Sequence, residues 1–229
     1  MLRPKPNPLR FAVLLLSGLV ALGCAEAMEA RARQVTTVDF ESAAVGELPA
    51  SFSTAVTGDG GPAAWRVVDD AGTPSAGKVL AQTSTDRTFF RFPLCVYEGL
   101  AATDVEVSVR FKPVSGTVDQ AVGLVARYRD KDLYDVVRAN ALEQNVGLYK
   151  VEQGKRRQFA GVDVKVPAKE WQALTLEVKG THFRLFLSDT LLFGVDDRTF
   201  SDAGKVGLWT KADSVTYFDD LTVKTSEAR

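Results

Sequence analysis

Residues Thr103–Phe111, with the sequence TDVEVSVRF, decide the fold class of this chain. From Val105 to Phe111 every second side chain is apolar, and the side chains between are polar or charged. Successive side chains of a β-strand point to opposite faces, so this alternation predicts a strand with one buried and one solvated face. Leu174–Val178 and Phe183–Leu187 repeat the pattern.

The same alternation continues from Val35 onward, interrupted by Gly, Pro and Asp turns, and no long helical stripe occurs. Further strands are predicted at Trp65–Val68, Val79–Gln82, Phe89–Phe92, Val118–Tyr128, Tyr134–Ala139, Val146–Glu152, Leu191–Val195, Val206–Thr210 and Val215–Val223. Gly154 and Gly180 each lie between two strand patterns, where a hairpin turn needs a positive φ. Many short antiparallel strands predict an all-β fold, a two-sheet antiparallel jelly-roll sandwich.

Composition narrows the classes of partner. The chain has 229 residues, 45% of them hydrophobic and 25% charged, which is ordinary for a globular protein. Its formal net charge of -1 provides no field that would attract a phosphate backbone, so we expect no nucleic-acid partner. With Cys24 and Cys95 as the two cysteines and His182 as the one histidine, neither a disulfide framework nor a zinc site is expected.

The N-terminal segment has the pattern of an export signal. Basic residues without an acid precede the apolar stretch 11–22, which is shorter than the roughly 20 residues of a membrane-spanning helix. The sequence is compatible with ordinary cleavage after Ala27 and with lipidation of Cys24. In a lipoprotein box a large aliphatic residue usually precedes a small one, and here Ala21 and Leu22 have the reverse order.

These features divide the chain into a signal peptide or lipoprotein leader at 1–27, a linker at 28–34 and a jelly-roll domain at 35–226. We expect an exported protein, in the periplasm, at the cell surface or secreted, that meets a membrane only through a lipid anchor.

Four segments carry a resemblance to a known superfamily: Glu170–Val178, Phe183–Leu187, Gly204–Thr210 and Tyr217–Val223. Their pattern resembles the concanavalin A-like lectin/glucanase jelly rolls, nearest to laminin-G-like domains and bacterial 3-keto-disaccharide hydrolase-type (glycoside hydrolase-like) domains. The resemblance implies two curved antiparallel sheets whose concave face or rim loops meet sugars. It is specific for the fold, because this sandwich carries lectins, glycanases and adhesion modules alike.

Sugar binding needs aromatic faces for the apolar side of a ring and planar polar groups for its hydroxyls. The candidate contacts are Tyr128, Arg138, Asn140, Asn145, Trp209 and Lys211. For Trp209 the alternative is a core aromatic, and for Arg138 an ion pair with Asp135 or Glu143. Trp171 is assigned to core packing.

Retaining glycanases of this superfamily carry Glu-x-Asp-x-Glu on one strand, which supplies the two carboxyl groups of their mechanism. The nearest match, Asp104-Val105-Glu106, has Ser108 in the third position, so no catalytic residue is assigned. An enzyme acting on 3-keto-disaccharides would instead use Asp119, Asp130 or Asp132 beside the concavity.

A structural calcium ion is a further expectation. Carbohydrate-binding jelly rolls often carry calcium between their first and last strands, and here Asp39, Glu41 and Asp220 would supply oxygen ligands. The alternative is that these acids protect strand edges from pairing.

The sequence thus predicts an exported domain, with or without a lipid anchor, that binds carbohydrate or another envelope glycan and has no recognisable catalytic motif. A hydrolase or lyase of 3-keto-disaccharides or related glycosides is the alternative, and a structural envelope adhesion module a third reading.

Overall fold

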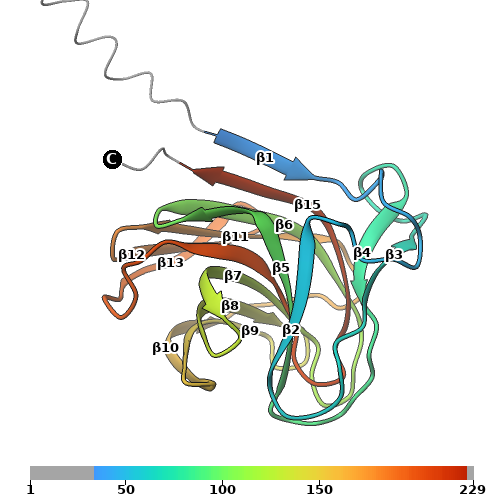
Figure 1. Ribbon diagram of the computed structural model, residues 1–229. Helices are drawn as coiled ribbons and strands as arrows, with labels where there is room; N and C mark the ends of the chain where they lie inside the picture. The colour runs from blue at the N-terminus through green and yellow to red at the C-terminus, as the bar shows by residue number, and fades with distance from the viewer. Residues whose placement is uncertain (1–33, 226–229) are drawn as a thin grey trace, which may run out of the picture. The chain divides into compact units, whose positions relative to one another are not determined.

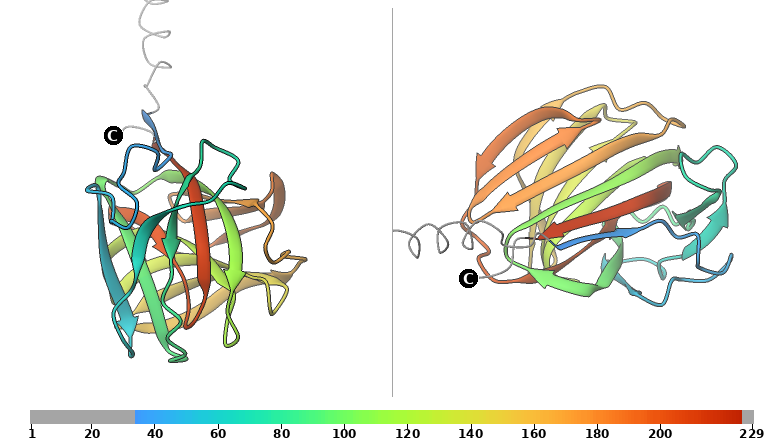
Figure 2. Two further views of the ribbon diagram at one scale, coloured as in Figure 1. Left: turned by 90° about the vertical axis from the view of Figure 1, so that its right-hand side faces the viewer. Right: turned by 90° about the horizontal axis from the view of Figure 1, so that it is seen from above.

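The computed structural model describes residues 34–225, which form fifteen strands and no helix (Figure 1). Within this part of the chain there is accordingly no helix that could cross a membrane. The predicted leader, most of the linker and Cys24 lie outside the described residues. The strands form two antiparallel sheets that face each other as the layers of a sandwich (Figure 2).

Sheet A has seven strands in one continuous order and an eighth at its side. The order is β13 (Thr190–Asp196), β12 (His182–Leu187), β11 (Gln172–Lys179), β6 (Val105–Ser115), β15 (Val215–Thr225), β4 (Lys78–Gln82) and β3 (Trp65–Asp69), and β1 (Gln34–Val38) pairs with β15. Strand β15 pairs with β4 through Thr216–Phe218 and with β1 through Leu221–Thr225. The partner changes at a bulge that contains Asp220, whose φ is 49°.

Sheet B has seven strands. Their order is β10 (Lys155–Asp163), β9 (Asn145–Glu152), β8 (Leu133–Asn140), β7 (Ala121–Asp130), β14 (Gly204–Trp209), β5 (Arg91–Ala102) and β2 (Phe52–Gly58).

The main core lies between the two sheets. Val107 and Phe111 of β6 and Leu176 of β11 are completely buried there against Leu124 of β7 and Val137 of β8. Each fully buried side chain of this size contributes about 1.5 to 3 kcal/mol to folding. The alternation in Thr103–Phe111 therefore predicted the strand and its buried face correctly.

Three strands were not among those predicted, and one of them carries a central residue of the site. These are β1 at Gln34–Val38, β2 at Phe52–Gly58 and β10 at Lys155–Asp163. The hairpin itself occurs as predicted, because Gln153 and Gly154 both adopt positive φ between β9 and β10. Strand β10 is an exposed edge strand, so it lacks the apolar alternation by which buried strands are recognised.

The outer face of sheet B is concave. The guanidinium carbon of Arg156, on edge strand β10, lies 5.4 Å from the ring centroid of Trp209 on β14 and 4.9 Å from that of Phe92 on β5. In sheet order these strands are four and five positions away, or roughly 19 to 24 Å in a flat sheet with about 4.8 Å between strands. The sheet must curl for these side chains to touch.

Candidate functional site

A second cluster of buried apolar side chains covers the concave face of sheet B. Trp209 is completely buried in it, stacks on Phe92 at 5.3 Å between ring centroids and donates a 3.3 Å hydrogen bond from Nε1 to the Tyr134 hydroxyl. Trp209 was predicted as a sugar contact, but its ring has no exposed face. The correct reading is the core aromatic, because the curled sheet encloses the side chain.

Two glycines make room for the aromatic rings. A Cβ atom at Gly123 would lie 3.1 Å from Cβ and Cε3 of Trp209, and one at Gly147 would lie 2.8 Å from Cε2 of Tyr149. Neither glycine has a positive φ, so their role here is spatial. Trp209 pairs with Gly123 of the neighbouring strand β7, and its ring lies over that glycine. Tyr149 lies over Gly147, two residues earlier on the same strand.

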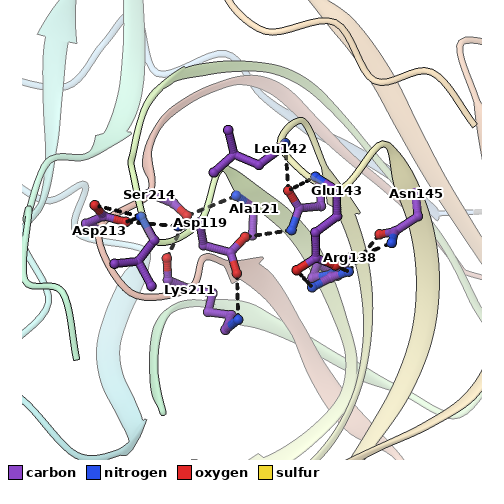
Figure 3. A network of polar contacts seen from close by, with 11 residues as sticks. Asp119, Ala121, Arg138, Leu142, Glu143, Asn145, Lys211, Asp213 and Ser214 are labelled. Carbon is purple, nitrogen blue, oxygen red and sulfur yellow. Dashed lines mark hydrogen bonds and ion pairs between the residues drawn. The ribbon is translucent and has the colours of Figure 1, made fainter. Parts of the chain in front are cut away.

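A polar network occupies one end of this face (Figure 3). It consists of Asp119, Arg138, Asn140, Glu143, Asn145 and Lys211, and is called the Asp119 network below. The Lys211 Nζ atom lies 2.6 Å from Asp119 Oδ2, and Asn140 Nδ2 donates a 2.7 Å hydrogen bond to Asp119 Oδ1. Burial raises the pKa of Asp119 above its usual value, and the opposing effect of Lys211 is smaller.

The other half of the network is exposed on one side. Arg138 Nη2 donates to Glu143 Oε2 at 2.6 Å and to Asn145 Oδ1 at 2.7 Å. Arg138 is almost completely buried, whereas the Glu143 side chain is 47% exposed. Burial acts to raise the pKa of Glu143, but the hydrogen bond and charge of Arg138 outweigh it and lower that pKa. The predicted alternative for Arg138, an ion pair with Glu143, is thus present within the network.

Asp213 fixes the loop that carries Asp119. Its carboxylate accepts hydrogen bonds from the backbone N–H groups of Thr117, Val118 and Asp119 and from the Thr117 hydroxyl, at 2.8 to 3.2 Å. Burial acts to raise the pKa of Asp213, and these four donors together lower it. Ser214 adds a second tie by accepting from the Ala121 N–H at 2.9 Å.

Arg91 fixes a neighbouring loop that carries an exposed aromatic pair. It is completely buried and donates to the carbonyl oxygens of Gly61, Pro62 and Ala212 at 2.7 to 3.1 Å. Asp86 accepts from the Gly61 and Thr88 N–H groups at 2.7 and 2.9 Å, and these two hydrogen bonds are the main reason that its pKa is lowered to about 2. Loops from three parts of the chain are therefore held together at this end of sheet B.

Exposed apolar side chains flank the Asp119 network. The Lys211 Nζ atom lies 4.0 Å from the ring centroid of Phe89, which is 55% exposed, and Phe90 meets Phe89 edge-on at 5.1 Å. On the other side Leu142, 47% exposed, is held by its N–H donating to Asn140 Oδ1 at 2.9 Å. The arrangement offers apolar faces next to fixed hydrogen-bonding groups.

The structure therefore brings four of the six predicted contacts together, Arg138, Asn140, Asn145 and Lys211, but Asn140 is completely buried and Arg138 and Lys211 are each 3% exposed. Tyr128 lies seven residues along β7 from Ala121, which pairs with Asn140, so Tyr128 is at the far end of the face, beside Tyr134. Phe89, Glu143 and Arg156 were not predicted as contacts. The strand predicted at Phe89–Phe92 was wrong for its first two residues, because β5 begins at Arg91 and leaves Phe89 and Phe90 exposed in a turn, so no sign in the sequence indicated Phe89 as a contact.

The predicted calcium ligands Asp39, Glu41 and Asp220 each have a protein partner. Glu41 Oε1 accepts from the Lys78 N–H at 2.9 Å, Asp39 Oδ1 accepts from the Glu41 N–H, and Asp220 pairs with Arg110 at 3.3 Å. Within residues 34–225 no group of three His, Cys, Asp or Glu side chains is placed to hold a metal ion. A structural calcium ion at these residues stays a prediction.

The acids proposed for an enzyme also separate. Asp130 accepts from the Asp132 N–H at 2.7 Å, and Asp132 pairs with Lys131 at 2.7 Å in the exposed turn between β7 and β8. This turn follows the end of β7 that carries Tyr128. Asp119 alone among the three belongs to the network.

A groove of about 530 Å³ lies elsewhere, on the outer face of sheet A. Its lining includes Trp171, Arg110 and Asp220 together with several hydroxyl side chains. Trp171 was expected in the core, but it is half-buried on this outer face, with the Lys112 ammonium 5.1 Å from its ring centroid. The groove shares no residue with the Asp119 network.

No family model matches this chain, and no curated protein matches it. Among solved structures, the carbohydrate-binding module CBM66 from Bacillus subtilis has a TM-score of 0.61 at 19% identity, covering 76% of this chain and 96% of that one. Domain 4 of AbnA, an extracellular GH43 arabinanase from Geobacillus stearothermophilus solved with arabinotriose, has a TM-score of 0.55 at 14% identity. The match covers 85% of this chain and 93% of that one. Bacillus licheniformis β-glucanase has a TM-score of 0.54 at 12% identity, and the match covers 85% of this chain and 98% of that one.

These likenesses establish the fold. The described part of the chain is an all-β, two-sheet antiparallel sandwich of the concanavalin A-like jelly-roll type, as the sequence predicted.

Proposed function

We propose that this protein is a glycan-binding domain, and that the glycan is bound by the accessible edge of the Asp119 network, formed by Glu143 and Asn145, and by the adjoining Phe89 ring. The observation that carries the proposal is the position of Phe89, half exposed and 4.0 Å from the ammonium of Lys211. A sugar ring has an apolar C–H face and an edge of hydroxyl groups. An exposed aromatic ring suits the first, and planar amide, carboxylate and guanidinium groups suit the second.

The site is also fixed before a ligand arrives. Arg138, Asn140 and Asp119 are held in place by the hydrogen bonds of the network, and Asp213 and Arg91 hold the loops around them. Side chains that are ordered in the free protein lose little conformational entropy on binding. This favours recognition of a specific hydroxyl arrangement.

The solved structures of similar fold support a sugar ligand, since they include a carbohydrate-binding module and an arabinanase domain solved with arabinotriose. The expected export signal is compatible with an envelope glycan as the ligand. An exported location, with or without lipidation at Cys24, is part of the proposal.

A glycan array followed by calorimetric titration of the retained glycans tests it. We expect binding, and we expect Phe89→Ala to weaken it by about tenfold or more, because an aromatic contact contributes about 0.5 to 1.5 kcal/mol beyond the apolar area it buries. Leu191→Ala is the matched control. Leu191 is also an exposed apolar residue, 48% accessible, but lies on β13 of sheet A. An array without any retained glycan, or equal losses in both variants, would contradict the proposal.

One observation favours an enzyme as a second candidate. Asp119 has a pKa raised by burial, and perturbed carboxyl groups in a concave site are candidates for acid–base chemistry. Against it, Lys211 and Asn140 occupy both of its oxygens. Incubation with 3-keto-trehalose or a 3-keto-glucoside decides. A product that forms with the wild type and not with Asp119→Asn would establish enzymatic activity. Absence of product with the wild type would contradict this second candidate function.

A further inference from the structure

Arg156 holds a positive charge at the centre of the concave face without a protein anion beside it. Its guanidinium carbon lies 4.5 Å from the ring centroid of Tyr149, and it also covers Phe92 and Trp209. Within residues 34–225 it takes part in no ion pair, and its Nη1 atom is buried without a hydrogen-bond partner. A second donor on this face, Nε of Arg138, is likewise buried and unpartnered.

The charges around it leave one cation in excess. Lys211 is paired with Asp119, and Arg138 with Glu143, so these four residues neutralise one another. Arg156 is the fifth charged residue of the region and brings a net charge of about one positive unit. Burial is the main reason that its pKa is lowered, and the charge of Arg138 acts in the same direction. The negative charge of an anion bound beside Arg156 would oppose both effects.

The rings beneath Arg156 fix its orientation. Stacking of a guanidinium on aromatic faces is favourable and keeps the planar group flat, with its N–H donors directed to the sides. Buried donors without partners are uncommon in folded proteins, because each one costs about 1 to 3 kcal/mol relative to a satisfied group.

Resting on the proposed function, we infer that the concave site selects glycans bearing a carboxylate, and that Arg156 is the residue that binds it. The carboxylate of a uronic acid carries one negative charge, which matches the single excess cation. Its two oxygens lie in a plane and can accept a pair of parallel hydrogen bonds from a guanidinium. Hydroxyl groups of the same sugar would be bound by the Asp119 network.

Oligosaccharides of galacturonate, glucuronate and mannuronate test this inference when each is compared with its own methyl ester. Esterification removes the charge and leaves the sugar backbone unchanged. At low salt we expect the wild type to bind at least one acid about 10- to 100-fold more tightly than its ester, the range that charge-assisted hydrogen bonds provide. We expect this preference to shrink at high salt, because exposed charge interactions are screened.

Arg156→Gln should remove the preference, and Arg156→Lys should keep a smaller one, since lysine retains the charge but not the planar pair of donors. Arg157→Gln is the matched control: it removes the same charge from the next residue of β10, which is exposed and points to the other side of the strand. Thermal melting of each variant shows that it is folded.

The outcomes separate the two proposals. Equal binding of acids and esters, binding of neutral glycans only, or a preference for sulfated sugars without an acid–ester difference would overturn the inference and leave glycan binding intact. A preference that survives in Arg156→Gln would overturn the role of Arg156. Failure to bind any glycan, acidic or neutral, would overturn the proposed function itself.

Discussion

The ammonium of Lys211 lies 2.6 Å from a carboxylate oxygen of Asp119 in a pair whose side chains are 4% and 0% exposed. The two residues come from the loops that precede β15 and β7, which are far apart in the sequence. Their ion pair therefore joins two loops that lie side by side at this end of sheet B. It also supports Phe89, which rests against the same ammonium.

Removing the cation should destabilise the protein strongly. Lys211→Met leaves Asp119 buried without its partner, and breaking such a pair typically costs about 3 to 5 kcal/mol in the free energy of unfolding. Adding Asp119→Asn should recover most of the loss, since the amide is neutral and its oxygen can still accept from Asn140. Urea unfolding of the single and double variants measures this. A double variant no more stable than Lys211→Met would show that the charge is not the cause.

Gly147→Ala should impair ligand binding without unfolding the domain. The new Cβ would lie 2.8 Å from Cε2 and from the hydroxyl oxygen of Tyr149, so this side chain must move, and with it the support for Arg156. We expect weaker glycan binding and a small change in melting temperature. Gly72→Ala is the control, because its Cβ would meet its nearest neighbour at an ordinary 3.6 Å. Unchanged affinity in Gly147→Ala would mean that Tyr149 has no part in the site.

Asp135 should make stability depend on pH. Both of its carboxylate oxygens are buried without hydrogen-bond partners, and this burial raises the pKa of Asp135 from 3.8 to about 7. Arg127, 4.0 Å away, lowers the pKa by a smaller amount. The folded state binds this proton more tightly than the unfolded state does. The contribution of Asp135 to the free energy of unfolding is therefore lost as pH rises from about 4 to 7. The loss is up to about 4 kcal/mol.

Asp135→Asn should therefore flatten the fall in melting temperature between pH 5 and pH 8. Arg127 keeps the carbonyl oxygens of Thr103, Gly180 and Phe200 as acceptors, so the substitution does not strand it. The exposed Asp163→Asn serves as the control and should behave like the wild type. The same pH dependence in Asp135→Asn as in the wild type would refute this assignment.

Substitutions of Trp209 should act through stability rather than through direct contact. Trp209→Ala removes a completely buried ring and should lower the free energy of unfolding by about 3 to 5 kcal/mol. Trp209→Phe retains the stacking on Phe92 and should bind glycan nearly as well as the wild type at a temperature where both are folded. Loss of binding by a fully folded Trp209→Phe would instead restore this residue as a ligand contact.

Local alternation explains how much of the fold was predictable. Each half-buried strand shows its period of two in the sequence, so β6, β11 and β12 could be located with their buried faces. Strand β10 shows no such period, because most of its side chains are exposed.

The site was predictable only where its residues are neighbours along the chain. Arg138 and Asn140 share one face of β8, and Asn145 lies across the hairpin from Asn140, so their proximity follows from strand geometry. Arg156 meets Trp209 only because sheet B curls, and curvature is a property of the whole sheet. For the same reason alternation placed Trp209 on the correct face but could not show that this face closes over it.

The central claim, a glycan bound at the concave end of sheet B, is tested most directly by nuclear magnetic resonance. The isotope-labelled protein is titrated with the glycan that the array retains most strongly, and the side-chain amide signals of Asn140 and Asn145 are followed. We predict that both signals shift and saturate together, while the indole signal of Trp171 in the groove of sheet A stays in place. Shifts confined to Trp171 and its surroundings, with both asparagine signals unmoved, would contradict the account.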